Sequence, residues 1–153
     1  MAAQQPVAKE PTYQRVDLKG FLAYRVGRLL RFKLTQNDSV TFPFTEFTMP
    51  ISENSMAGSV ALTGEVIELE DAYQIPPDRP YHFNPKYDQD SNYRTRSMLT
   101  LPMKNAKGEV LGVLQLINCK RDWGARLRSP EDVEREVRPF SKSDVRQALS
   151  LAS

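Results

Sequence analysis

Cys119 and His82 are the residues whose side chains come closest to nucleophilic or metal-binding chemistry, and each is the only one of its type in the chain. A single cysteine excludes a disulfide within the chain and a Cys/His metal cluster. A Cys–His nucleophile pair would require both side chains to converge in the fold, and we expect that they do not. We interpret Cys119 as a small buried residue. The sequence therefore predicts neither a catalytic pair nor a metal site.

A long segment from Glu70 to Asp90 is a better place to look for function. It is polar and aromatic, and four prolines interrupt it: Pro76, Pro77, Pro80 and Pro85. Neither a regular helix nor a central strand is expected here. Long ordered loops are often functional, so this segment is a candidate cover for a binding site; the alternative is a poorly ordered surface loop.

Composition limits the classes of partner. Of the 153 residues 40% are hydrophobic and 26% are charged, which is typical of one globular domain. The net charge is only +2, and no dense basic block is present, so nucleic acid is not expected as a partner. No apolar run approaches the ~20 residues of a membrane span, so no membrane association is expected. Scarcity of cysteine is typical of the reducing cytoplasm, which is the expected location.

The elements that would position the proline-interrupted segment begin with a hairpin. Residues 1–16 are expected to form a polar N-terminal tail and residues 17–153 a single domain. Two apolar runs, Gly20–Val26 and Leu29–Thr35, flank a glycine-containing pair and predict a β-hairpin. A proline interrupts Val40–Phe47, which we interpret as an irregular edge strand or loop.

Helix and strand signals continue on both sides of the segment. Ser52–Thr63 is predicted as a short helix, with Ser52 or Asn54 as its N-terminal cap and Gly64 as its C-terminal cap. Strands are predicted at Val66–Leu69, Arg96–Met103 and Val110–Asn118. The last of these is apolar on both faces apart from Gln115, which indicates a central strand of a sheet covered on both sides.

A charged insertion, Lys120–Pro139, separates this sheet from the last helix. Ser129 and Pro130 predict the start of a helix within the insertion. Ser141 caps a C-terminal helix over residues 141–153, with Asp144 at the capping-box position. The helical pattern continues to the last residue, so we expect the domain to lead into a further domain.

Several blocks between Ser55 and Asn118 together resemble the GAF domain family. They are Ser55–Glu65 (SMAGSVALTGE), Asp71–Tyr73 (DAY), Asp88 with Tyr93–Leu99 (YRTRSML), Pro102–Asn105 (PMKN) and Gly108–Asn118 (GEVLGVLQLIN). Each block alone is weak, but their order and spacing are jointly specific. They are similar to GAF domains of cyclic-nucleotide phosphodiesterases and of bacterial proteins with HD-type phosphohydrolase or cyclase outputs. The resemblance implies an α+β fold, GAF-like and related to profilin and PAS domains, with an antiparallel sheet of about six strands flanked by helices.

The resemblance also implies a set of ligand-binding residues, because cyclic nucleotides in this family lie beneath the helix and loop between the first and third blocks. The set is Met56, Ala57, Asn84, Asp88, Ser91, Thr95 and Gln115. Backbone N–H groups near a helix start can approach an anion. The hydroxyls can donate to phosphate oxygens, and the glutamine amide can both donate to and accept from a base.

Other interpretations of these residues stay open. Met56 and Ala57 could be plain core contacts, and Gln115 could be a buried amide bonded to the backbone. Three aromatic residues could stack on a ligand ring or simply pack in the loop: Phe83, Tyr87 and Tyr93. Two arginines could form surface ion pairs or contact phosphate: Arg94 and Arg96.

A family signature at the end of the central strand is partly kept. In relatives a lysine–aspartate ion pair ties this strand to the last helix. Here Asn118, Phe140 and Asp144 match the signature, whereas Cys119 stands in the place of the lysine and Val145 in that of a glutamate. Lys120 follows at once and could substitute through the longer connection, or the tie could be absent. The family's long first helix is not apparent in the sequence.

The resemblance implies a regulatory domain that senses a small molecule, with cAMP or cGMP as the leading ligand, in a bacterial signalling protein. A homodimer and an adjacent output domain, such as an HD-type phosphohydrolase or a cyclase, are expected as partners. No cofactor and no enzymatic activity are expected, because the methionine sulfoxide reductases of the family use several cysteines. The alternative is a ligand-free dimerisation module with a vestigial pocket.

Overall fold

One antiparallel sheet forms the centre of the computed structural model, which describes residues 16–36, 47–122 and 124–152. The strands lie in the order β3-β2-β1-β6-β5-β4, and β7 pairs with the end of β6. They are β1 Val16–Val26, β2 Leu29–Gln36, β3 Phe47–Pro50, β4 Ile67–Leu69, β5 Met98–Lys104, β6 Val110–Lys120 and β7 Val137–Arg138. The helices are α1 Met56–Thr63, α2 Lys86–Ser91, α3 Pro130–Glu136 and α4 Lys142–Leu151. The predicted α+β fold is confirmed.

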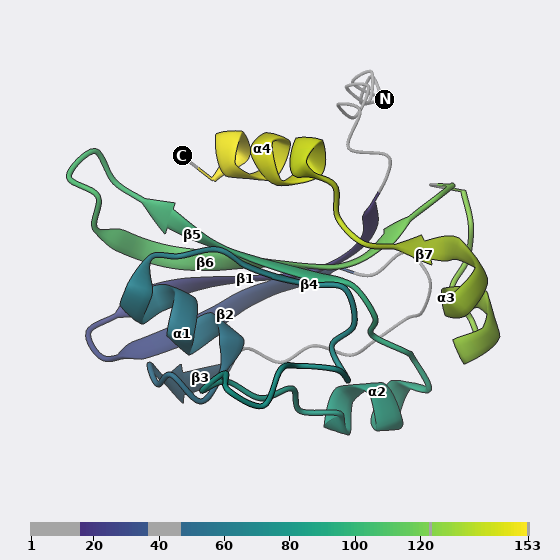
Figure 1. The fold of residues 1–153 in the computed structure, drawn as a ribbon. Helices are drawn as coiled ribbons and strands as arrows, with labels where there is room; N and C mark the ends of the chain where they lie inside the picture. Colours follow the sequence, from purple (N-terminus) through teal and green to yellow (C-terminus); the bar gives the residue numbers. More distant parts are fainter. Residues whose placement is uncertain (1–15, 37–46, 123, 153) are drawn as a thin grey trace, which may run out of the picture.

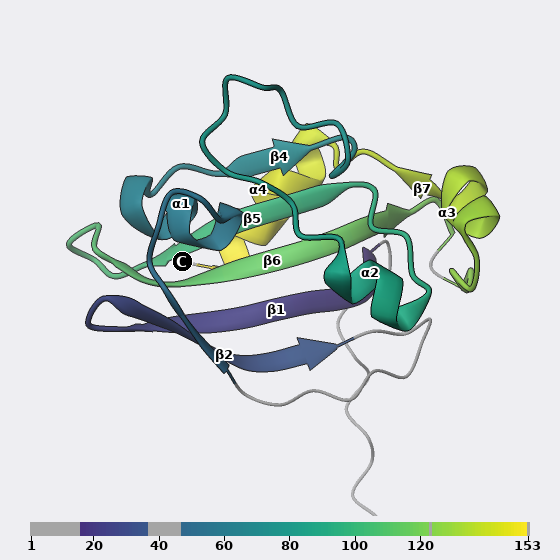
Figure 2. The same ribbon diagram turned by 90° about the horizontal axis from the view of Figure 1, so that it is seen from below.

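Helices cover both faces of the sheet. Figure 1 shows α4 on one face, here called the α4 face, and α1 and α2 on the other, here called the α1 face. Seen from below in Figure 2, α1 and α2 lie across the sheet, and the segment that leads from β4 to α2 passes over β5. Buried residues on the α1 face include Met56, Val60, Val113 and Ile117. Those on the α4 face include Leu99, Leu101, Phe140 and Ala148.

The predicted hairpins and the central strand are confirmed. β1 and β2 pair from Val26 and Leu29 onwards, across Gly27, whose φ of 59° is a left-handed conformation that glycine adopts without strain. β6 pairs with both β1 and β5, so it is central to the sheet. β1 begins earlier than predicted, at Val16. The N-terminal tail and most of Val40–Phe47 lie outside the described residues.

Helix α1 begins later than the sequence predicted. Its N-terminal cap is Ser55, whose hydroxyl accepts a hydrogen bond from the Gly58 N–H at 2.9 Å, so the expectation of Ser52 or Asn54 was wrong. The C-terminal cap at Gly64 is confirmed by its φ of 70° and its N–H bond to Val60 O at 2.8 Å. Ser52 still shapes the start of α1, because its backbone oxygen would lie 2.0 Å from a Cβ at position 58.

Helix α2 corrects the expectation that no helix would form between Glu70 and Asp90. It starts directly after Pro85, and a proline is tolerated at a helix start because the first N–H groups have no partner within the helix. Asn92 ends it with a φ of 52°. The prolines before Pro85 precede the helix and do not interrupt it.

The charged insertion is folded onto the end of the sheet. α3 has the predicted cap at Ser129 and the predicted proline in its first turn, and β7 then pairs with β6 through Cys119–Arg138 and Lys120–Val137. The capping box of Ser141 and Asp144 starts α4 as predicted. Among the described residues, no helix combines the length and the hydropathy needed to cross a membrane.

Candidate functional site

A cavity of about 250 Å³ lies between the start of α1, the segment 82–84, α2 and the α1 face of the sheet. Its polar lining residues are Ser55, His82, Asn84, Asp88, Thr95 and Gln115. Its apolar lining residues are Phe32, Met49, Met56, Ala57, Phe83, Met98 and Ile117. This combination of an apolar wall with a few polar groups is typical of small-molecule sites, although the volume lies just below their usual range of ~300–1,000 Å³.

The structure brings most of the predicted site residues together around this cavity. Six of the seven line it: Met56, Ala57, Asn84, Asp88, Thr95 and Gln115. Ser91 does not, because Asp88, almost one helical turn earlier on α2, takes the position against Thr95. Met56 and Ala57 are also buried core residues, so the core interpretation of them is confirmed, whereas their contact with a ligand stays a prediction.

Sequence analysis missed the apolar wall contributed by the strands. Phe32, Met49, Met98 and Ile117 come from β2, β3, β5 and β6. The alternation of side chains along a strand could have indicated one of these residues, because Ile117 lies two residues after Gln115 and therefore on the same face of β6. Gln115 donates from Nε2 to the Thr100 hydroxyl at 3.3 Å, a side-chain partner and not the backbone partner of the alternative interpretation.

The aromatic residues of the loop differ in role. Phe83 lines the cavity. Tyr93 is buried, does not line the cavity, and accepts a hydrogen bond from Asn118 Nδ2 at 2.9 Å, so stacking by Tyr93 on a ligand in this cavity is not supported. The side chain of Tyr87 lies outside the described residues.

Asp88 is the buried polar centre of the cavity wall. Its Oδ2 accepts hydrogen bonds from the Thr95 N–H at 2.8 Å and from the Tyr73 hydroxyl at 2.7 Å. Its Oδ1 accepts from the Thr95 hydroxyl at 2.7 Å. Only 4% of Asp88 is exposed, so these bonds replace the water that a carboxylate needs. Asp88 thereby fixes α2 against the start of β5.

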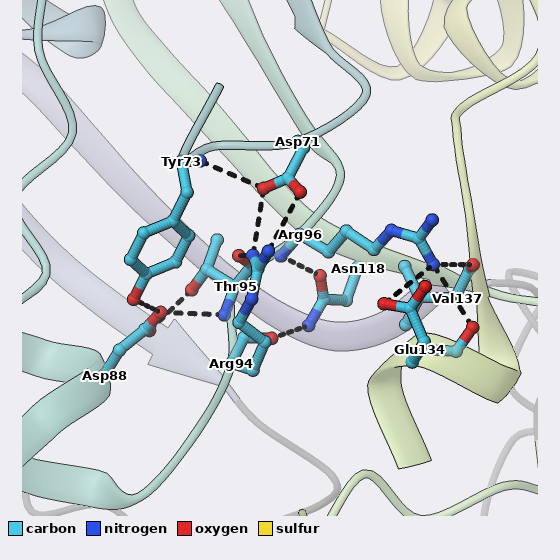
Figure 3. A network of polar contacts seen from close by, with 9 residues as sticks. All are labelled: Asp71, Tyr73, Asp88, Arg94, Thr95, Arg96, Asn118, Glu134 and Val137. Carbon is cyan, nitrogen blue, oxygen red and sulfur yellow. Dashed lines mark hydrogen bonds and ion pairs between the residues drawn. The ribbon is translucent and has the colours of Figure 1, made fainter. Parts of the chain in front are cut away.

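Tyr73 connects Asp88 to an ion pair at the surface (Figure 3). Arg94 donates two hydrogen bonds to the carboxylate of Asp71, at 2.9 and 2.8 Å. Its guanidinium carbon lies 4.3 Å from the centre of the Tyr73 ring, a cation–π arrangement. Burial, followed by the bond to Asp88, raises the pKa of Tyr73 to about 12. Although burial opposes it, hydrogen bonding by Arg94 lowers the pKa of Asp71.

Asn118 holds the chain where β5 and β6 approach α3. Its backbone has a φ of 60° and its side chain is fully buried. Its Oδ1 accepts from the Arg96 N–H at 2.6 Å, and its Nδ2 donates to the Arg94 carbonyl at 2.8 Å. Arg96 in turn donates to the carbonyls of Glu134 and Val137, each at 3.2 Å. Arg94 and Arg96 therefore serve in ion pairs and loop contacts, and neither lines the cavity.

An ion pair ties the sheet to the last helix, but it comes from β7 and not from Lys120 at the end of the central strand. Lys120 is buried and donates from Nζ to the Ala125 carbonyl at 2.9 Å. Arg138 of β7 supplies the cation instead, with Nη1 2.8 Å from Asp144 Oδ2. The thiol of Cys119 lies 3.7 Å from the same oxygen. The physical reason is that β7 pairs with β6 at Cys119, which brings Arg138 beside the position the lysine would occupy.

Cys119 and His82 lie on opposite faces of the sheet, so they do not converge, as predicted. Cys119 is buried in the cluster against α4, whereas His82 lines the cavity on the α1 face. The two side chains therefore form no nucleophilic pair. Among the described residues no group of three or more His, Cys, Asp and Glu side chains is placed to hold a metal ion.

The chain resembles curated cyclic-nucleotide phosphodiesterases over short stretches. It is 43% identical over 96 residues to the dual 3',5'-cyclic-AMP and -GMP phosphodiesterase 11A of Takifugu rubripes, which is 63% of this chain and 10% of that protein. It is 41% identical over 63 residues to phosphodiesterase 11 of Drosophila melanogaster, which is 41% of this chain and 4% of that protein. The matched region is thus a small part of each relative.

Solved structures share the fold at low sequence identity. The GAF domain of a phosphoenolpyruvate-protein phosphotransferase from Coxiella burnetii superposes with a TM-score of 0.60 at 19% identity, over 90% of this chain and 67% of that one. The A. Aeolicus nlh2 GAF domain gives a TM-score of 0.57 at 15% identity, over 90% and 70%. The profile of the GAF domain matches residues 14–136. The chain belongs to the GAF domain family.

Proposed function

We propose that this GAF domain is the non-catalytic, ligand-binding regulatory part of a larger cytoplasmic signalling protein. The observation that carries the proposal is that six residues chosen from the sequence line a single cavity with an apolar wall. Regulation would follow if the ligand binds one conformation more tightly than another. The tie of Arg138 to Asp144 gives the sheet a direct connection to α4, the last described element before the C-terminus.

A cyclic nucleotide, cAMP or cGMP, is the leading ligand. The start of α1 opens on the cavity at Ser55, Met56 and Ala57, and the N-terminus of a helix favours a phosphate. Phe83 offers a ring beside the cavity, and Gln115 keeps hydrogen-bonding capacity for a base edge. The names of the phosphodiesterase relatives support the same class of ligand.

Isothermal titration of the intact chain with cAMP and cGMP tests the proposal. Gln115→Leu is expected to weaken binding about tenfold, since a lost hydrogen bond to a ligand is worth ~1.5 kcal/mol. Gln147→Leu is the matched control, because Gln147 is exposed on α4. No heat with either nucleotide at millimolar concentration would reject the cyclic nucleotide. An equal effect of both substitutions would reject this cavity as its site.

A dimerisation module is the second candidate, supported by exposed apolar residues on α4. Leu149 and Leu151 are 37% and 55% exposed, which leaves apolar side chains of α4 accessible to a second copy of the chain. Sedimentation of wild type and of Leu149→Ser/Leu151→Ser would test it. A monomer at all concentrations contradicts a homodimer through α4.

The identity of the output is the remaining part of the proposal. We favour a bacterial protein with an HD-type phosphohydrolase or a cyclase beside this domain, because the charged insertion of 120–139 is similar to the long connection in such proteins. Joining the domain to each of these outputs and measuring turnover with and without cAMP or cGMP tests the coupling. Turnover that never responds to ligand contradicts it.

A further inference from the structure

His82 forms no pair with Cys119, but it lines the cavity on the α1 face. Among the described residues its imidazole makes no hydrogen bond and no ion pair, so the ring is available to a ligand. The described lining of the cavity contains no lysine and no arginine. His82 is therefore the one lining side chain of the described chain that can carry a positive charge.

The backbone fixes His82 beside the start of α1. Its N–H donates to the Asn54 carbonyl at 3.0 Å, and His82 forms a parallel bridge with Ser55, the N-terminal cap of α1. Ser55 lines the cavity together with the first two residues of the helix, Met56 and Ala57. The first N–H groups of a helix have no partner within it and attract an anion. An imidazolium beside them adds a full positive charge to the partial charge of the helix start.

The negative charge of the lining comes from a different element. Asp88 of α2 is its only carboxylate among the described residues. Two further charged side chains lie near His82 but do not line this cavity. Arg79 shares a neighbouring cavity with His82, and Glu53 precedes the residue that bonds the His82 N–H. Asp88 therefore repels an anionic ligand group from the α2 side, and the α1 side attracts it (Figure 2).

We propose that His82 is the cationic contact for an anionic group of the ligand, such as the phosphate of a cyclic nucleotide, and that it holds this group at the start of α1. The inference rests on the proposed function only in naming this cavity as the ligand site. Imidazole is charged at acidic pH and neutral at alkaline pH, so the affinity for an anion should rise as the pH falls. A contact from lysine or arginine would show no such change over the same range.

Isothermal titration with cAMP and cGMP at about pH 5.5 and about pH 8 measures this dependence. The cyclic phosphate diester keeps one negative charge at both values. Because His82 is exposed, binding is expected to be about fivefold tighter at the lower pH, the factor for opposite charges ~4 Å apart in water. His82→Gln should remove the difference. Arg79→Gln is the matched control, since it removes a nearby charge that does not line the cavity, and it should keep the difference.

The titration of the imidazole gives a second, independent measurement. His82 is the only histidine of the chain, so its ring protons are identified in the NMR spectrum without assignment. By linkage, a ligand that binds the imidazolium about fivefold more tightly moves the midpoint of this titration up by about 0.7 pH units. Adenosine and guanosine, which lack the phosphate, should leave it in place. Dimethyl phosphate, a diester with the same single charge, should raise it relative to chloride at equal ionic strength.

Two results would overturn the proposal: a pH dependence of nucleotide binding that persists in His82→Gln, or a bound nucleotide that leaves the His82 midpoint unchanged. If neither nucleotide binds, the cyclic-nucleotide assignment fails and dimethyl phosphate decides the role of His82. A raised midpoint, together with shifts of the Met56 and Ala57 amide signals, would support the anion contact. An unchanged midpoint would reject it.

Discussion

Replacement of Arg138 by glutamine tests the assignment of the tie between the sheet and α4. The Nη1–Oδ2 distance to Asp144 is 2.8 Å, and the two side chains are 22% and 10% exposed. An exposed pair of this kind contributes ~0.2–1 kcal/mol, and breaking a fully buried pair costs ~3–5 kcal/mol. Asp144 keeps its bond from the Ser141 N–H at 2.8 Å. Arg138→Gln is therefore expected to lower the free energy of unfolding by ~2 kcal/mol, or ~4–8 °C in Tm.

A double-mutant cycle in urea separates this pair from the alternative that the sequence suggested. The coupling energy between Arg138→Gln and Asp144→Asn is expected to be ~1–2 kcal/mol. Lys120→Met also costs stability, since Lys120 is buried and bonded to the Ala125 carbonyl, but its coupling to Asp144→Asn is expected to stay within ~0.5 kcal/mol. Arg135→Gln, 64% exposed, is the control for loss of a surface arginine.

The pH dependence gives the same pair a second test. Burial alone would raise the pKa of Asp144, but the hydrogen bonds from Arg138 and Ser141 lower it below its ordinary value of about 3.9. The stability from this group is present above the unfolded pKa and is lost as the pH falls through the lower folded pKa. The difference between wild type and Arg138→Gln should therefore be constant down to about pH 4 and shrink below it. The assignment of the tie would be refuted if the double-mutant cycles gave a larger coupling energy between Lys120 and Asp144 than between Arg138 and Asp144.

Three further predictions follow from buried contacts. Gly58→Ala is expected to destabilise the chain by at least ~2 kcal/mol in urea unfolding, because its Cβ would lie 2.0 Å from the backbone oxygen of Ser52; a change below ~0.5 kcal/mol would contradict the close approach. Asn118→Ala should cost ~3–5 kcal/mol, since it leaves buried groups unpaired and keeps a φ of 60°; retained stability would show that water replaces the amide. Burial and Asp88 raise the pKa of Tyr73 to about 12, so the near-ultraviolet absorbance of the chain should show an ionisation step at about pH 12. This step should vanish in Tyr73→Phe and move to lower pH in Asp88→Asn. Because the pKa is raised in the folded state, the stability linked to Tyr73 is lost as the pH rises from about 10 towards 12.

Local chemistry explains what could be predicted from the sequence. Gly27 and Gly64 occupy left-handed positions, and each marks the end of an element that the sequence located within a few residues. The apolar pattern of β6 on both faces identified the central strand, because only a strand covered on both sides tolerates it. Six of the cavity residues followed from a resemblance whose blocks lie in the correct order.

Contacts between distant segments explain what could not be predicted. The role of Arg138 depends on the pairing of β7 with β6, which no local pattern of the charged insertion indicates. The choice of Asp88 over Ser91 as a cavity residue depends on the direction in which α2 leaves Pro85. The Tyr73 contact with Phe83 likewise joins two positions of a proline-rich loop whose path is set by the sheet beneath it.

The pairing of β7 with β6 places an unequal constraint on changes in chain length within the insertion. Between Lys120 and the start of α3 a change in length leaves the pairing of β7 with β6 in register, and its cost is limited to the packing of Leu127 and the bond from Lys120 to the Ala125 carbonyl. A single-residue insertion between Ser129 and Arg138 would slip Arg138 out of register with Cys119 and turn its side chain to the other face of the sheet, and one between Arg138 and Ser141 would shift α4 relative to Arg138. Homologous chains that vary in length should therefore vary before Ser129 and keep the twelve-residue interval to Ser141 whenever the arginine is retained.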